Sequence, residues 1–235
     1  MKLAIGIATY QRSDGSTPRY LSRALESVKN QTHQDFKVFL IGDRYDNNNE
    51  FVELATSILN PTQIYFENRS IAPERDLYPI GSKNLWCSGG VSAYNHAIDC
   101  ARSQGYDYVC HLDHDDYWNK NHLEYINQVI EHDLNVGLIF SCARHFDGMV
   151  LPRGVPLNNL VHQRIPIPAD TIHSSVCINH RLIPLKYRDV FALEGRALEA
   201  DMDMWSRVRD YLTSNAEIKS YLIGAVTCFH DIESH

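Results

Sequence analysis

The sequence predicts an α/β fold in which helices flank a mostly parallel central sheet. Apolar runs of strand length alternate with segments whose apolar residues recur at helical spacing, and repeated strand–helix units of this kind form parallel sheets. In addition, residues 2–8 and 106–112 are apolar runs that end abruptly in polar side chains, as buried strands do where they leave a sheet. Ligands of open α/β sheets bind at such strand ends.

The other elements follow from the same spacing, and Pro61 and Gly105 are expected to end two of the helices. The expected strands are residues 2–8, 36–41, 63–66, 106–112, 136–142, 171–179 and 221–229. The expected helices are residues 18–31, 47–59, 91–101, 120–132 and 199–212. Residues 67–90 and 144–170 are rich in Pro and Gly, so we expect a long loop that could act as a lid, and a hairpin with loops. The second half is therefore α+β in character.

Composition limits the possible classes of protein. The chain has 235 residues, of which 44% are apolar and 22% charged, as in a single soluble domain. A formal net charge of −7 argues against nucleic acid as a partner. Six cysteines without a Cys-x-x-Cys pair favour a reducing, cytoplasmic location. No stretch is apolar enough to span a bilayer, so any membrane contact is expected to be peripheral.

Three carboxylates, Asp113, Asp115 and Asp116, follow the apolar run at residues 106–112. Alternate side chains of an extended strand share a face, so Asp113 and Asp115 are expected to point the same way. Like charges this close repel each other, and a hard divalent cation that also binds phosphate relieves the repulsion. The sequence thus predicts a metal–phosphate site. The alternative is a solvated acidic turn that caps the helix beginning near Asn119.

Five segments in the same order resemble the motifs of glycosyltransferase family 2, the nucleotide-sugar transferases with a GT-A fold. They are Thr9-Tyr10-Gln11-Arg12, the strand end at Asp43, residues 90–97, Leu112-Asp113-His114-Asp115-Asp116, and residues 200–207. The resemblance implies a single GT-A domain over residues 1–235 with a Rossmann-like central sheet. Residues 1–118 would bind the nucleotide sugar, and residues 119–235 would form the α+β half that binds the acceptor.

The resemblance also implies roles for single residues. Asp43 would accept a hydrogen bond from a uracil-like base beside the Tyr10 ring, and Asp201 would be the general base. Further residues expected at the donor site are Thr9, Arg12, Gly90, Asn95, Asp113 and His114. The expected ligands of Mn²⁺ or Mg²⁺ are Asp113, Asp115 and His230.

The chain departs from the family pattern at Ala200, where a glutamate is expected. Either Glu199 or Asp201 is then a candidate base, while Asp203 is expected to orient its neighbours or to cap the turn. Several other side chains have a functional and a structural interpretation. His173 could contact the acceptor or be an ordinary strand residue, and Trp118 and Trp205 could be platforms for a sugar ring or part of the core. Arg69, Arg75 and Lys83 could bind phosphate when the loop closes, or they could be ordinary charged loop residues.

The function expected from these residues is metal-dependent, inverting transfer of a sugar from a nucleoside diphosphate sugar, with UDP the expected carrier. The acceptor would be a hydroxyl of a glycan or glycoconjugate. A nucleotidyltransferase is one alternative, although residues 9–15 make a poor phosphate loop. A binding module without turnover is another. Ala200 favours the module, and the intact set of three aspartates argues against it.

Overall fold

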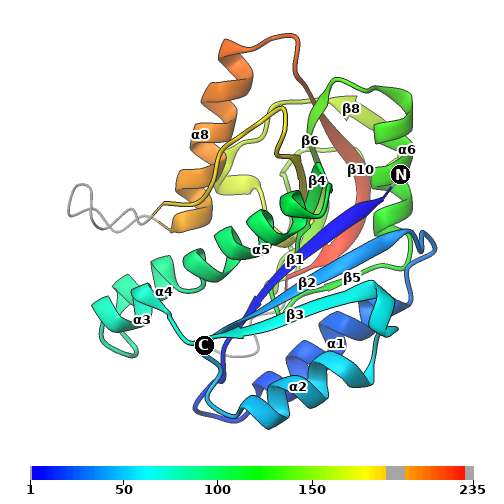
Figure 1. The fold of residues 1–235 in the computed structure, drawn as a ribbon. Coiled ribbons are helices and arrows are strands. Elements are labelled where there is room, and N and C mark those ends of the chain that lie inside the picture. Colours follow the sequence, from blue (N-terminus) through cyan, green and yellow to red (C-terminus); the bar gives the residue numbers. More distant parts are fainter. Residues whose placement is uncertain (1, 189–198, 231–235) are drawn as a thin grey trace.

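A computed structural model describes residues 2–188 and 199–230 and confirms the α/β fold class. Its centre is a mixed sheet with the strand order β3-β2-β1-β4-β9-β6-β10-β5, covered by helices on both faces (Figure 1). In the described ranges, no helix is long and apolar enough to cross a membrane.

The first four strands of the path are parallel, as the sequence predicts. They are β1 (Leu3–Thr9), β2 (Phe36–Asp43), β3 (Ile64–Arg69) and β4 (Tyr108–His111). The helices that connect them are α1 (Thr17–Lys29), α2 (Asn48–Ser57) and α5 (Val91–Ser103), with a short 3-10 turn at Pro61–Gln63 before β3. The carboxyl ends of these parallel strands therefore meet at one edge of the sheet.

Successive side chains of β1 point to opposite faces of the sheet, so the core consists of two layers. Leu3, Ile5 and Ile7 pack with α1, α2 and α6 (His122–His132) on one face. Ala4 and Ala8 pack with α5 and α8 (Ala200–Ser214) on the other. All of these β1 residues are buried, which explains why the strand reads as a continuous apolar run.

The second half of the sheet contains antiparallel strands. Strand β9 (Val176–Asn179) runs antiparallel to both β4 and β6 (Val136–Arg144), and the long β10 (Lys219–Phe229) runs parallel to β6. Short antiparallel strands complete it: β5 (Tyr117–Trp118), β7 (Val150–Leu151) and β8 (Val161–Gln163). The expected α+β character of this half is confirmed.

Two predicted segments differ from the structure. The strand expected over residues 171–179 begins only at Val176, because residues 173–175 form a 3-10 turn in which the Ser175 amide donates to the Ile172 carbonyl at 3.0 Å. A second 3-10 turn precedes it at Pro168–Asp170.

The long loop expected over residues 67–90 contains the end of β3 and two short helices, α3 (Pro73–Leu77) and α4 (Lys83–Ser88). Pro73 lies in the first turn of α3, and the Ser82 side chain caps α4 by accepting from the Leu85 amide. The segment is also held by its side chains, since the Glu74 carboxylate accepts from the Ser92 amide at 2.9 Å.

Candidate active site

The predicted site residues gather at the carboxyl edge of the parallel strands. Thr9 ends β1 and Asp43 ends β2, and both are buried. Gly90 precedes α5 with φ +78°, a conformation that favours glycine. A side chain at this position would make only ordinary contact with Ala8, so the backbone angle is what requires glycine. The N-terminus of α5 is thereby brought beside the end of β1.

Asp113 is held by two elements that lie far apart in the sequence. The Tyr94 hydroxyl on α5 donates to its carboxylate at 2.6 Å. The Asp113 amide donates to the Ser174 Oγ at 2.9 Å, and Nε2 of His173 lies 3.9 Å from Asp113 Oδ1. Burial and the nearby charge of Asp115 raise the pKa of Asp113. The carboxylate is therefore fixed in place but carries a charge that the protein only partly compensates.

Asp115 forms a partly buried ion pair with Arg12, whose Nη2 lies 2.7 Å from the Asp115 Oδ2. Arg23 on α1 donates to the backbone carbonyl of Asp115. Burial acts to raise the pKa of Asp115, but the neighbouring His114 and Arg12 outweigh it and lower the pKa. Asp115 is therefore ionised at neutral pH.

Asp116 is fully buried and pairs with His230 at the end of β10. The Nδ1 of His230 lies 3.1 Å from both Asp116 oxygens. Although burial opposes a charge on the ring, the hydrogen bond and the carboxylate raise the pKa of His230 to about 9. The predicted metal ligand His230 is thus brought to the acidic turn through Asp116, and its Nδ1 is the ring nitrogen that faces this carboxylate.

The acidic turn fits a hard divalent cation. Asp113, Asp115 and Asp116 are balanced at close range by Arg12 and the imidazolium of His230, and burial raises the pKa of two of the three carboxyls, Asp113 and Asp116. Oxygen donors with unbalanced negative charge are the ligands that Mg²⁺ and Mn²⁺ prefer. Asp115 is shared with Arg12, so cation binding there competes with this ion pair.

Asp43, Tyr10 and His114 form a second part of the site. Asp43 has a buried Oδ1 without a hydrogen-bond partner among the described residues, and burial raises the pKa of its carboxyl. The Tyr10 ring is partly exposed. Its centroid lies 5.4 Å from that of the His114 ring, and the two rings are nearly perpendicular. The Arg75 guanidinium lies 5.4 Å from the Tyr10 ring and donates to the Asp43 carbonyl. An unpaired acceptor beside an aromatic ring suits a planar ligand that has an N–H group.

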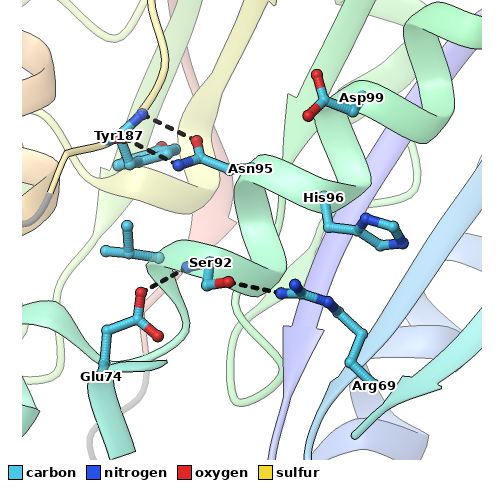
Figure 2. A pocket seen from close by; sticks show the side chains of 8 residues that line it. Arg69, Glu74, Ser92, Asn95, His96, Asp99 and Tyr187 are labelled. Carbon is cyan, nitrogen blue, oxygen red and sulfur yellow. Dashed lines mark hydrogen bonds between the residues drawn. The ribbon is translucent and has the colours of Figure 1, made fainter. Parts of the chain in front are cut away.

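Asn95 has a different environment from the other predicted donor-site residues. Its amide group makes two hydrogen bonds with the backbone of Tyr187, at 2.9 and 3.0 Å. Figure 2 shows this pair beside a pocket of about 320 Å³ that Arg69 and Glu74 also line. The Tyr187 hydroxyl in turn lies 3.1 Å from Nδ1 of His173. Asn95 therefore connects α5 to the segment that supports His173.

Of the two candidate bases, Asp201 is the more closely coupled to the acidic turn. It lies in the first turn of α8, where its Oδ1 accepts from the Met202 amide at 2.7 Å. Burial raises its pKa, the nearby His173 lowers it, and the charge of Asp113 also acts on it. Glu199 is the residue that precedes α8, and its side chain makes no capping hydrogen bond. Both remain candidates for the base.

Asp203, Trp118 and Trp205 have structural contacts. Asp203 is buried between Arg188 and Arg207, at 2.7 and 2.8 Å, which agrees with its expected orienting role. Trp118 and Trp205 are buried, so of their two interpretations the structure supports core packing. The Trp118 Nε1 donates to the Ser174 carbonyl at 2.6 Å. Residues that sequence reasoning did not assign to the site include Tyr94, Ser174 and Arg23, whose partners are remote in sequence.

Comparisons with known proteins identify the family of this chain. Residues 82–183 match the model of Glycosyl transferase family 2. An uncharacterized glycosyltransferase of Acanthamoeba polyphaga mimivirus is 35% identical over 238 residues, covering 99% of this chain and 95% of the relative. An uncharacterized glycosyltransferase of Nostoc sp. is 30% identical over 139 residues, which is 59% of this chain and 36% of the relative.

Among solved structures, S. aureus TarS has a similar fold. Its residues 1–349 in complex with UDP-GlcNAc superpose with a TM-score of 0.69 at 13% identity, covering 100% of this chain and 60% of that one. The same fragment alone gives 0.66 at 14% identity over 98% of this chain. The chain thus spans 60% of the TarS structures it matches. With a relative 35% identical along nearly its whole length and a matching family model, this chain belongs to glycosyltransferase family 2 and has the GT-A fold.

Proposed function

We propose that this chain transfers a sugar, with inversion and with the help of a divalent cation, from a UDP-sugar to a hydroxyl of a glycan or glycoconjugate. The observation that carries the proposal is the partly buried acidic turn, Asp113 to Asp116, which follows β4 at the same sheet edge where β2 ends in Asp43 with its unpaired Oδ1. TarS, which shares the fold, is described with both UDP and UDP-GlcNAc.

The uracil base would bind at Asp43. Its unpaired oxygen accepts the imide N–H of the base, and the Tyr10 ring stacks on the base plane. Arg75, which already contacts both residues, orders this end of the site. Thr9, Arg12, Gly90 and His114 surround the path from the base to the diphosphate.

The diphosphate would bind at the acidic turn with Mn²⁺ or Mg²⁺ held by Asp113 and Asp115. His230 would be a further ligand in its neutral form, after the cation has displaced a ring proton. Such a cation neutralises the charge that develops on the leaving diphosphate. Tyr94 and Ser174 keep Asp113 in a fixed orientation for this role, through the bonds at 2.6 and 2.9 Å. Arg12 lies next to Asp115 and adds a positive charge where the phosphates enter.

Transfer would follow from deprotonation of the acceptor hydroxyl by Asp201. The oxygen then forms a bond to the anomeric carbon while the bond to the diphosphate breaks, and attack from the opposite face inverts the configuration. The proton ends on the Asp201 carboxylate, whose raised pKa makes it a better proton acceptor than an ordinary aspartate. Glu199, at the start of the same helix, is the second candidate for this role.

The first experiment is calorimetric titration of UDP, GDP and dTDP with and without Mn²⁺, followed by a hydrolysis assay on UDP-sugars. We expect UDP to bind more tightly with the metal. Asp115→Ala should abolish the metal-dependent part of binding, and Asp201→Ala should keep binding but lose transfer. Asp210→Ala, at an exposed position of α8, is the matched control.

The results separate the proposal from its alternatives. Binding of UDP without any turnover of UDP-sugars would indicate a binding module. Full transfer by Asp201→Ala would exclude that residue as the base and lead to Glu199→Ala. No nucleotide binding in the presence of metal would leave the acidic turn as a structural feature. A cytoplasmic location remains part of the proposal, and the six cysteines, all unpaired, are consistent with it.

A further inference from the structure

Three side chains with the chemistry of zinc ligands converge away from the acidic turn. Glu67 lies on β3, and His96 and Cys100 lie on α5. One donor atom from each lies within 4.8 Å of the other two, and all three residues are partly buried. Among the described residues, no other group of three potential metal ligands lies this close together.

The spacing of these atoms is close to that of a tetrahedral zinc site. The His96 Nε2 lies 2.9 Å from the Glu67 Oε2 and 3.5 Å from the Cys100 Sγ. With ordinary zinc–ligand bond lengths, tetrahedral angles put nitrogen and oxygen about 3.4 Å apart, and nitrogen and sulfur about 3.6 Å apart. For these two atom pairs, a small withdrawal of the Glu67 oxygen is the adjustment that an ion would require.

The backbone supports this arrangement. His96 and Cys100 are separated by four positions, so they lie one above the other on the same face of α5. Figure 2 shows that His96 leaves the helix on the side of Arg69, the last residue of β3. Two ligands come from a rigid helix and the third from the strand beside it.

Neighbouring side chains complete the surroundings of a metal site. The Tyr65 hydroxyl donates at 2.7 Å to the Glu67 Oε2, the same oxygen that faces His96, and so restrains this carboxylate. The Arg69 guanidinium donates to the Ser92 Oγ at 2.6 Å, and its positive charge favours the ionised forms of Glu67 and Cys100. His96 and Glu67 are about one third exposed, which leaves room for a water molecule as the fourth ligand.

We propose that Glu67, His96 and Cys100 form a binding site for Zn²⁺ that fastens β3 to α5. A thiolate and an imidazole select a soft, tetrahedral ion, whereas the oxygen ligands of the acidic turn select Mn²⁺ or Mg²⁺. Binding releases the proton of the Cys100 thiol as the zinc–sulfur bond forms. The site steadies α5, the helix from which Tyr94 reaches Asp113.

Titration with Co²⁺ tests the proposal without any enzyme assay. The wild-type protein should develop the near-ultraviolet band of a cobalt–thiolate bond, and this band should saturate at one equivalent. Zn²⁺ should abolish this band, and excess Mn²⁺ should not. Cys100→Ser should lose the band, whereas Cys142→Ala, which removes a buried thiol of β6, should keep it.

Thermal unfolding provides the second measurement. Zn²⁺ should raise the Tm of the wild type and of Cys142→Ala by several degrees, and should leave Cys100→Ser and His96→Ala unchanged. Similar Tm values for the wild type and the three variants, measured with a chelator present, would show that the variants fold. The proposal is wrong if the cobalt band persists in Cys100→Ser, or if the wild type gives no band. Neither readout depends on donor binding or transfer.

Discussion

The Tyr94 hydroxyl donates a hydrogen bond of 2.6 Å to the Asp113 carboxylate, which joins the first turns of α5 to the end of β4. Burial raises the pKa of both groups; the Tyr94 side chain is buried and Asp113 is partly exposed, so this bond is made at the border of the core. The two residues are 19 positions apart, and α5 connects them. The orientation of Asp113 is therefore set by the helix that precedes its strand.

Tyr94→Phe removes this hydrogen bond while keeping the ring. We expect donor affinity in the presence of metal to fall about tenfold, since a hydrogen bond to a charged group contributes about 1.5 kcal/mol. Calorimetric titration of UDP with Mn²⁺ measures the change. Tyr125→Phe on α6 is the control and should bind normally. Equal affinities for the two variants would show that the Tyr94 hydroxyl does not contribute to donor binding.

Asp43→Asn should weaken nucleotide binding and stabilise the protein. Burial raises the pKa of the Asp43 carboxyl, so ionising it at neutral pH costs folding free energy that a neutral amide does not. We expect a higher Tm, together with a loss of UDP affinity of about 1 to 2 kcal/mol. Thermal unfolding and calorimetry test the two effects separately. A fall in Tm would mean that the charge of Asp43 is needed for folding.

Asp203→Ala should destabilise the protein by about 2 kcal/mol, because it leaves Arg207 without the buried carboxylate that it contacts at 2.8 Å. Asp210→Ala, on the exposed side of the same helix, should change the stability by less than about 0.5 kcal/mol. Urea unfolding of both variants gives the comparison. Similar values for the two would show that the Asp203 cluster is energetically neutral.

Buried histidines should make the fold sensitive to mild acid. Burial, together with the charge of Arg102, lowers the pKa of His180 from 6.5 to about 4. The unfolded chain therefore binds a proton between these two values that the folded chain excludes, and stability falls as the pH drops through this window. For His180 the loss between pH 7.5 and 5 is about 2 kcal/mol.

His180→Phe should reduce the acid sensitivity by this amount, which urea unfolding at the two pH values measures. His132→Phe, at an exposed position at the end of α6, is the control and should leave the sensitivity unchanged. An identical pH profile for His180→Phe and the wild type would contradict the assigned role of His180.

The sequence predicts the strand-end residues well because a buried strand has a strong apolar signal and its end is easily located. Thr9, Asp43 and Asp113 are located by this signal. The side chains that contact these residues cannot be predicted in the same way. Ser174 contacts Asp113 from 61 positions away, and Arg23 contacts Asp115 from 92 positions away. Such contacts depend on how the sheet is ordered, and no local pattern encodes them.

The short helices α3 and α4 show a second limit. Each has fewer than two turns, which is too short for an apolar periodicity to be read, and the prolines and glycines around them predict a loop. Pro73 in the first turn of α3 and Ser82 as the cap of α4 are visible in the sequence, but only a longer helical pattern would identify them as helix starts.

Ser174 has a consequence for how ligands bind. Its hydroxyl accepts from the Asp113 amide, and its carbonyl accepts from the Trp118 indole, so one residue fastens both ends of the turn that carries the carboxylates. A turn restrained at both ends has little conformational entropy left to lose when a ligand arrives. We therefore expect nucleotide and cation to associate with a site that is already shaped, at rates set by diffusion and desolvation rather than by loop ordering.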